Sequence, residues 1–528
     1  MIGESAAAPG QSRRVVSVDK LRATLSDLLD DGFVVALVSA QLMGDGVRIS
    51  YAMVRAIDDA RVEVQIRVAE GGEFPSAADL SYPVGRFERE IHDLYGLTPS
   101  GHPMPYRLVR HGHWPRGWYP MVGPSGMVPA FDDDVGEYPF TPVQGTGVYE
   151  IPVGPVHAGL IEPGHFRFSV VGETILRMKA RLWFLHRGIE RLFVGRTPLQ
   201  AIELTERVSG DTAVGHTLAF CLAVEEALAV AVPDEVQLAR AMLLELERVY
   251  NHIGDLGAMA NDVGFSFAHS HAQRLREEML RLNERLTGHR LLRGGVSVGT
   301  AHVNALPDRD FLRSIADQVQ ELVALTLGNR TVLDRFSGTA VLPRQAAGDL
   351  GTLGYVARAS GLALDARRDH PFCELPGSFA IITEEGGDAL ARYRVRVGEL
   401  AIAFRLIQDI AEELGGGDVT RVRRGEDVSD SPEDRGRPDG PPSAVRVPGA
   451  LRGSEAGFAS GLGLVEGWRG RIAHRVEFAA DGTLARVKIV DPSFFNWPAL
   501  GVALADTIVP DFPLANKSFN QSYAGNDL

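Results

Sequence analysis

The stretch at residues 233–264, PDEVQLARAMLLELERVYNHIGDLGAMANDVG, carries the clearest structural signal in this chain. Its apolar residues recur at alternating steps of four and three, at Met242, Leu246, Val249, Ile253 and Leu256. Because an α-helix completes a turn every 3.6 residues, these positions fall on one stripe of a long helix. The stretch therefore predicts a helix that buries one face in a bundle.

Two further stretches show similar patterns, at residues 310–333 and 391–414, and the second stops at a run of glycines that begins with Gly415. Several long antiparallel helices should form the core. Residues 461–478 and 483–491 instead alternate apolar and polar side chains, which predicts two strands of a small sheet.

The amino-terminal part has a different character. Residues 21–32 have helical spacing, and residues 62–68, VEVQIRV, alternate as a half-buried strand does. The acidic, proline-bearing segment at 131–142 follows. We therefore predict an α+β multidomain protein, with a small α/β domain over 1–145 and a mainly helical domain with small sheets over 146–528. A charged, Gly- and Pro-rich stretch predicts a mobile loop at 415–445.

Composition bounds the function classes. A chain of 528 residues with 45% apolar and 23% charged residues should be globular and exceed one domain. It has no apolar run of the roughly 20 residues that a membrane-spanning helix needs. The formal charge of -14 argues against nucleic acid as a partner. The amino terminus lacks the apolar core of a signal peptide, so we expect a cytoplasmic location.

The cysteine count limits the cofactors. Iron–sulfur clusters usually take four thiolates, as does a nickel–iron centre, and this chain has two cysteines. Cys221 lies in a helical run and is expected to be a small buried thiol. Cys373 is a lone loop cysteine. The chain alone should bind neither kind of metal centre.

Five ordered motifs and one fused segment carry a family resemblance. The motifs are GPVHAGLIEPGHFRF at 154–168, LHRGIERLF at 185–193, ERVSGDTAVGH at 206–216, VEGWRG at 465–470 and DPSFFNWP at 491–498. They resemble the large subunit of membrane-bound nickel–iron hydrogenases and the related 49-kilodalton, quinone-site subunit of respiratory complex I. FEREIHDLYGLTPSGHP at 87–103 resembles the 30-kilodalton subunit of complex I. The fused arrangement resembles formate hydrogenlyase large subunits.

The resemblance implies where a nickel–iron site would lie. The family takes two thiolates from each of two loops, and the matching positions here are Ser209, Thr212, Ser493 and Asn496. Alcohols and a neutral amide bind nickel and iron poorly compared with thiolates. Hydrogenase activity and a metal in this chain are therefore not expected.

In complex I the same region receives a quinone, held by a histidine and a tyrosine. His157 matches the histidine segment, whereas the tyrosine position falls on Gly210, for which Tyr106 or Tyr250 could substitute. The resemblance implies that Glu162 and its neighbour His165 pass protons with His157, although these three side chains could equally hold a loop by hydrogen bonds.

Further candidates come from the remaining motifs. His216 could donate into the cavity or cap and pack a helix. Arg469 matches an arginine that overhangs the family's metal, or it pairs with Asp491, which is itself a site candidate. His186 and Arg187 lie in the segment that faces the partner's terminal iron–sulfur cluster in the family, where they could tune that cluster.

Two functions follow from the resemblance. One is electron transfer from the iron–sulfur cluster of a partner to a quinone-like acceptor, within a complex like formate hydrogenlyase or an NADH dehydrogenase. The other is a non-catalytic subunit that docks partners, with the old cavity filled by Phe494, Phe495 and Trp497. In both cases the expected partners are a small iron–sulfur subunit and membrane-embedded antiporter-like subunits, at the cytoplasmic face of the membrane. Direct NADH binding by this chain is not supported, because no dinucleotide fingerprint is present.

Overall fold

A computed structural model describes residues 11–123, 127–132, 136, 138–157, 161–377, 379–415 and 459–528. The mobile loop predicted over 415–445 lies outside the described residues, except for Gly415. None of the helices in the described ranges combines the length and apolar character needed to cross a bilayer.

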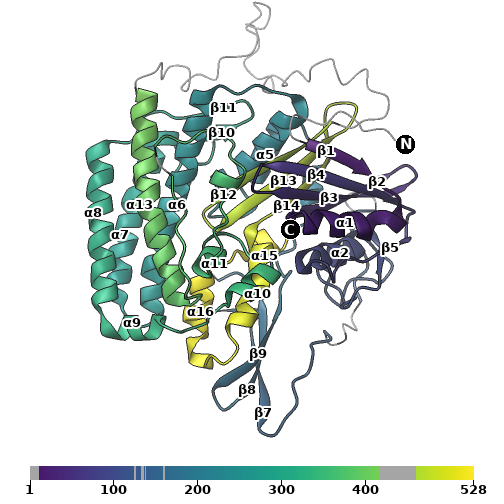
Figure 1. The fold of residues 1–528 in the computed structure, drawn as a ribbon, viewed down its shortest axis with the longest axis horizontal. Helices are drawn as coiled ribbons and strands as arrows, with labels where there is room; N and C mark the ends of the chain where they lie inside the picture. Colours follow the sequence, from purple (N-terminus) through teal and green to yellow (C-terminus); the bar gives the residue numbers. More distant parts are fainter. Residues whose placement is uncertain are drawn as a thin grey trace, which may run out of the picture.

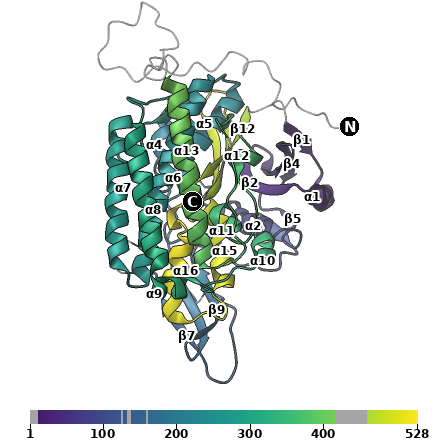
Figure 2. The same ribbon diagram turned by 60° about the vertical axis from the view of Figure 1, so that its left-hand side comes forward.

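A bundle of long helices forms one side of the molecule (Figures 1 and 2). The predicted helix at 233–264 is confirmed as α6 (Asp234–Asp262), which packs against α7 (Ser266–Thr287) and α13 (Ala389–Gly415). The stretch 310–333 divides into α8 (Arg309–Gly328) and α9 (Arg330–Phe336). The division falls at Asn329, whose side chain accepts hydrogen bonds from the first turn of α9 and so starts a new helix.

Shorter elements complete this half. They are α3 (Ile189–Leu192), α4 (Pro198–Thr205), α5 (Ala213–Leu228), β10 (Val296–Ser297), β11 (Thr300–Ala301), α10 (Arg344–Asp349), α11 (Gly354–Ala359), α12 (Ala366–Asp369), α15 (Pro492–Ala503), α16 (Phe512–Phe519) and α17 (Tyr523–Asn526). Two 3-10 turns lie at Val18–Lys20 and Val509–Asp511.

The sheet near the carboxyl end has three strands where two were predicted. Its order is β12 (Ser460–Gly467), β13 (Gly470–Phe478) and β14 (Leu484–Val490). The first predicted strand folds back on itself because Gly467 pairs with Gly470, which has a φ of 134° that favours glycine. Helix α5 packs on β12 and β13, and α15 begins directly after β14.

The amino-terminal part forms a four-stranded sheet in the order β1-β4-β3-β2. The elements of the amino-terminal part are β1 (Gln11–Val15), α1 (Leu21–Asp30), β2 (Val34–Met43), β3 (Gly46–Arg55), β4 (Ala60–Val68), β5 (Glu73–Pro75), α2 (Tyr82–Tyr95) and β6 (Thr98–Ser100). Strands β5 and β6 pair with each other in a separate two-stranded sheet. Another three-stranded sheet, β7 (Val148–Val153), β8 (His165–Val171) and β9 (Thr174–Arg181), projects at the bottom of Figure 1.

Two hydrophobic cores hold these layers together. One lies among the long helices, α5 and the inner face of the β12–β14 sheet. The other joins the amino-terminal sheet to β8, β9 and α15, and in it the rings of Phe87 and Phe494 stack with centroids 4.5 Å apart. The predicted α+β class is confirmed. The boundary near residue 145 stays a prediction, because side chains from both sides of it share this second core.

Candidate functional site

Two loops meet where α5 and α15 begin. Ser209 and Thr212 precede α5, whereas Ser493 and Asn496 lie in the first turns of α15, and all four side chains are buried. The tail of residues 520–528 runs between the loops, because Ser209 Oγ lies 2.8 Å from Ser522 Oγ and the Ser522 N–H donates to Ser493 Oγ at 2.9 Å. The structure thus brings the two predicted metal-ligand loops to one place.

An ion pair that was not expected from the sequence ties the first loop to the turn between β12 and β13. Arg469 donates to Asp211 through both terminal nitrogens, at 2.8 and 2.6 Å, and Ser209 and Thr212 each donate to the same carboxylate at 3.0 Å. Arg469 is 4% exposed and Asp211 36%. Partial burial opposes the ionised carboxylate, but Arg469 outweighs it and lowers the pKa of Asp211 to about 2. The ion-pair partner of Arg469 is therefore Asp211, and not Asp491.

The remaining metal-ligand positions are also engaged by protein groups. Asn496 accepts a hydrogen bond from the Leu353 N–H at 2.8 Å and donates to the Leu353 carbonyl at 3.2 Å. The Trp468 indole N–H donates to Thr212 Oγ1 at 3.1 Å. Both of these side chains thus make hydrogen bonds within the chain.

These residues do not fit a nickel–iron centre. The four positions offer three alcohols and an amide, which are poor ligands beside thiolates, and their polar atoms already have partners. Within the described ranges, no group of three or more His, Cys, Asp or Glu side chains could hold a metal ion.

His216 lies between the two loops and is fully buried. Its Nε2 lies 3.0 Å from Asp491 Oδ2, and its Nδ1 lies 3.0 Å from His474 Nε2. Asp491 also accepts from the Ser493 N–H and caps α15. Burial opposes its charge, but the hydrogen bond from His216 lowers the pKa of Asp491 below its ordinary value. The arrangement is a buried His474–His216–Asp491 chain.

His474 was not predicted. His474 lies two residues from both Ile472 and Val476, on the same face of β13, which packs on α5. The available signal in the sequence was therefore a histidine within an apolar stripe. Burial, followed by the neighbouring His216, holds the pKa of His474 well below its ordinary value. A neutral His474 that donates from Nε2 to His216 leaves its Nδ1 as a bare acceptor, which agrees with that atom having no partner.

Beneath the first loop lies Glu247, a third site residue that was not expected from the sequence. Its carboxyl group accepts hydrogen bonds from the Val214 and Gly215 N–H groups at 2.7 and 3.0 Å, at the start of α5. Burial nevertheless raises the pKa of Glu247 to about 8. Of the two candidate tyrosines, Tyr250 lies at this site and donates to the Asp211 carbonyl, whereas Tyr106 is exposed in the amino-terminal part.

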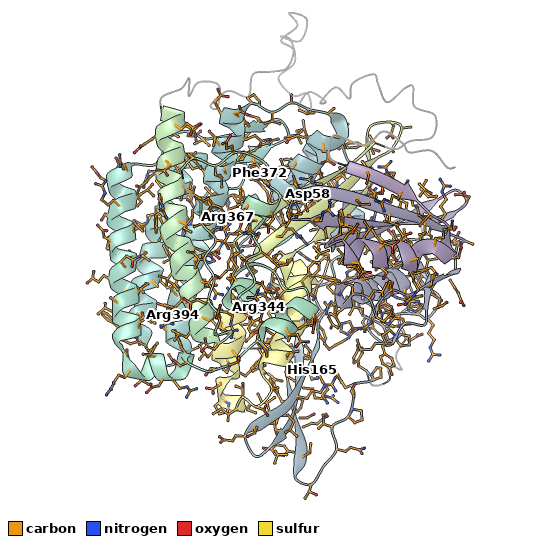
Figure 3. All side chains as sticks on the ribbon, in the orientation of Figure 1. Asp58, His165, Arg344, Arg367, Phe372 and Arg394 are labelled. Atoms are coloured by element: carbon orange, nitrogen blue, oxygen red, sulfur yellow. The ribbon has the colours of Figure 1, made fainter. Side chains whose placement is uncertain are left out.

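The predicted proton-passing residues lie in or next to the connection between β7 and β8. His157 and His165 each bond a glycine carbonyl of the same connection, at 2.8 and 3.2 Å. Figure 3 labels His165 at the lower sheet. Glu162 accepts from the Ala524 N–H at 3.1 Å, so this side chain contacts the tail. Among the residues that the structure describes, no hydrogen bonds join these three side chains into one chain.

The tail occupies much of the space between the loops. Residues 521–528 are all buried. The Trp497 indole N–H donates to the Ser522 carbonyl at 3.1 Å, and its ring lies 4.8 Å from that of Tyr523. Phe494 and Phe495 instead contact Phe87 of α2. Of the three aromatic residues expected to fill the cavity, Trp497 packs against the tail and the two phenylalanines face the amino-terminal part.

His186 and Arg187 lie beside an open cavity. His186 Nδ1 lies 2.7 Å from the Leu528 carbonyl, and Arg187 donates to the carbonyls of Arg207 and Val208 in the first loop. The cavity has a volume of about 300 Å³. Its lining includes Leu94, Trp114, Trp118, Met121, His186, Arg187, Leu192 and Leu528. This cavity is mostly apolar and can receive a planar ring.

Family models match most of the chain. The model of the respiratory-chain NADH dehydrogenase 49 Kd subunit matches residues 262–527, and that of the 30 Kd subunit matches residues 15–123. A nickel-dependent hydrogenase model matches residues 187–255.

Curated relatives agree with these matches. Formate hydrogenlyase subunit 5 of Escherichia coli is 32% identical over 88% of this chain and 78% of its own length. An NADH-quinone oxidoreductase subunit of Deinococcus radiodurans is 31% identical over 69% of this chain and 93% of its own. A chain of a membrane-bound sulfane sulfur reductase, an archaeal respiratory membrane complex, has the same fold, with a TM-score of 0.61 and 24% identity over 74% of this chain and all of its own.

Proposed function

The chain belongs to the family of the respiratory-chain NADH dehydrogenase 49-kilodalton subunit and of formate hydrogenlyase-type large subunits, and from this premise we propose its function. It is the large subunit of a membrane-associated oxidoreductase complex. It accepts electrons beside the iron–sulfur cluster of a partner and passes them to a quinone-like acceptor, without a nickel–iron centre.

The observation that carries this proposal is the replacement of the metal-ligand set by protein contacts. The Asp211–Arg469 pair and the hydroxyl groups of Ser209 and Thr212 tie together a region that a metal would otherwise cross-link. Electrons that reach this subunit must therefore go to an acceptor that is not a resident metal.

The cavity beside His186 is the place we assign to the acceptor. The tail takes up space between the two loops, whereas this cavity is open and presents the indole rings of Trp114 and Trp118. A planar apolar headgroup stacks favourably on such rings. A neutral His186 that donates from Nδ1 to the Leu528 carbonyl has a bare Nε2 that only accepts, so this atom can bond a hydroxyl group of the reduced acceptor.

The proposed reaction is the reduction of a quinone by two electrons and two protons to a quinol. The electrons come singly from the partner's cluster, and the protons come from solvent. Glu162 is an exposed carboxylate in contact with the tail, so it is placed to pass protons inward. His157 and His165 act with it by holding the loop through their bonds to glycine carbonyls.

The proposed partners are a small iron–sulfur subunit against the segment of His186 and Arg187, and membrane-embedded antiporter-like subunits. The chain itself would be a peripheral subunit at the cytoplasmic face of the membrane. Its relatives include a formate hydrogenlyase subunit and an NADH-quinone oxidoreductase subunit, which supports this placement.

The test is to purify the tagged complex from native membranes in mild detergent and to measure nickel, iron, bound quinone and quinone reduction. We expect iron from the partner, no stoichiometric nickel, bound quinone, and reduction that an inhibitor stops. Trp118→Ala should raise the KM for quinone, while Trp183→Phe, a conservative change outside the cavity lining, should not. Stoichiometric nickel, or the absence of inhibitor-sensitive quinone reduction, would contradict the proposal.

A non-catalytic docking subunit is the second candidate, and the buried tail favours it. A region filled by residues 521–528 and Trp497 needs no ligand to be stable. In that case the purified complex would contain the partners and iron but neither bound quinone nor quinone reductase activity.

A further inference from the structure

The turn between β3 and β4 reaches from the amino-terminal sheet to the end of α12. His370 directly follows α12, and its Nδ1 lies 2.7 Å from Oδ1 of Asp59 in this turn. The two residues are 311 positions apart in the sequence. Figure 3 labels Asp58, the neighbour of Asp59. The contact therefore joins the amino-terminal part of the chain to the helical part.

The backbone of the turn favours the residue type found at Asp59. Asp59 has a φ of 49°, in the left-handed region. Aspartate and asparagine adopt this region more readily than most residues with a side chain, because their short polar groups form local hydrogen bonds. Asparagine can therefore replace Asp59 and remove its charge while the turn keeps its shape.

Asp59 stays ionised at neutral pH. Partial burial opposes its charge, but the hydrogen bond from His370 and the charge of Arg61 together lower the pKa of Asp59 below its ordinary value. A carboxylate with a lowered folded-state pKa stabilises the fold above its unfolded pKa of about 3.9 and loses that effect as pH falls below it. Asp59 therefore keeps its charge between about pH 5 and 8.

His370 is the member of the pair whose residue type changes charge in this range. Histidine gains a proton between about pH 8 and 5. The Nδ1–H group of a neutral His370 donates a hydrogen bond to Asp59, and a proton added at Nε2 makes the ring a cation. The side chain of His370 is 2% exposed and that of Asp59 37%, so solvent screens the contact from the side of Asp59.

One other group next to α12 titrates in the same range. Glu466, on β12, accepts the Ala366 N–H at 2.9 Å, and burial raises the pKa of Glu466 to about 7. Its effect must therefore be separated from that of His370. The other charged side chains on the elements around the pair bond carboxylates, arginines or carbonyl groups, and they are Asp58, Arg61, Arg367, Arg368, Asp369 and Arg471.

We propose that the His370–Asp59 contact is a pH-sensitive link between the two parts of the chain. When His370 takes up a proton, the hydrogen bond becomes an ion pair and holds the β3–β4 turn more tightly against α12. When His370 loses that proton, the turn is held by the neutral hydrogen bond and by Arg61, which also donates to the Leu462 carbonyl of β12 at 3.2 Å. The link does not depend on the proposed electron transfer.

The test is hydrogen–deuterium exchange of the full chain between about pH 5 and 8, with each rate corrected for the intrinsic pH dependence of amide exchange. We expect the amides of residues 56–61 to become about threefold more protected at the acidic end, because the added interaction is a partly exposed ion pair. Asp59→Asn should remove this rise. His370→Asn should also remove it, since its amide nitrogen replaces Nδ1 as a donor but does not titrate.

Asp45→Asn is the matched control. It removes an exposed carboxylate that pairs with Arg67, at the turn between β2 and β3 of the same sheet, and should keep the rise in protection.

Each outcome decides the proposal. A rise in protection that both Asp59→Asn and His370→Asn remove supports the link. Asp59→Asn leaves Glu466 unchanged, so a rise that persists in this variant belongs to Glu466 or another group and overturns the proposal. Equal protection of residues 56–61 across the pH range in the wild type would overturn it as well. Should His370→Asn fail to fold, Asp59→Asn decides alone, because the Asp59 side chain is partly exposed.

Discussion

Replacing Asp211 with asparagine should test whether the Asp211–Arg469 pair holds the first loop to the turn between β12 and β13. A surface ion pair contributes about 0–1 kcal/mol, whereas breaking a fully buried pair costs about 3–5 kcal/mol. Here Arg469 is 4% exposed but Asp211 is 36% exposed, so solvent screens one end. Arg469 also keeps its hydrogen bond to the Asn520 carbonyl at 2.6 Å. We therefore expect Asp211→Asn to lower the free energy of unfolding by about 2 kcal/mol at pH 7.

The assay is denaturant unfolding of the full chain, monitored by tryptophan fluorescence because Trp468 donates to the Asp211 carbonyl. The pKa of Asp211 is lowered in the folded state to about 2, so its stabilisation is present above its unfolded pKa of about 3.9 and is lost as pH falls towards 2. The difference between wild type and Asp211→Asn should shrink over that range. Glu277→Gln, in an exposed ion pair, is the control and should cost less than about 1 kcal/mol.

A double-mutant cycle supplies the refutation. If the two side chains act on each other, Asp211→Asn combined with Arg469→Gln should cost clearly less than the sum of the two single changes. Additive costs, or a loss below about 0.5 kcal/mol for Asp211→Asn, would show that the pair does not tie the loop.

Three other changes test the surroundings. Burial raises the pKa of Glu247 to about 8, so between about pH 4.3 and 8 the folded state binds more protons than the unfolded state, and wild-type stability should fall as pH rises through that window. Glu247→Gln should make the thermal unfolding temperature depend less on pH over the same range. An unchanged pH dependence would contradict this. Gly525→Ala would place a methyl group 2.6 Å from the Asp491 carboxyl carbon and should cost about 1–3 kcal/mol in denaturant unfolding, while Gly328→Ala, which has open space, should not destabilise the chain. Phe87→Ala should cost about 3–5 kcal/mol by the same measurement and increase protease cleavage in the amino-terminal part, and wild-type resistance would show that the shared core is not required.

The long helices could be predicted because their signal is local. The spacing of Met242, Leu246 and Val249 is visible without knowing what packs against them. The extra strand in the carboxyl-terminal sheet was missed because a tight turn at Gly467 and Gly470 depends on strand pairing. The shared core was missed because contacts such as Phe87 with Phe494 join residues far apart in sequence.

The site was predictable where a motif carried it. The resemblance located both loops and picked out His216 and Asp491, which the structure places 3.0 Å apart. It did not identify Asp211 or His474, because each matters only through a partner from another element. A carboxylate beside a loop serine has no special meaning in sequence until an arginine from a distant turn reaches it.

The buried part of the tail, residues 521–528, also sets an order of events during synthesis. The loop at 206–216 leaves the ribosome about 300 residues before Ser522, which at roughly 5–20 residues per second is an interval of about 15–60 s. Until then Ser209 and Trp497 lack their contacts with the tail, and apolar side chains around them are uncovered. A nascent chain with such a delay is a natural client for a chaperone, and ribosome stalling before Ser522 is made should leave this region open to proteolysis.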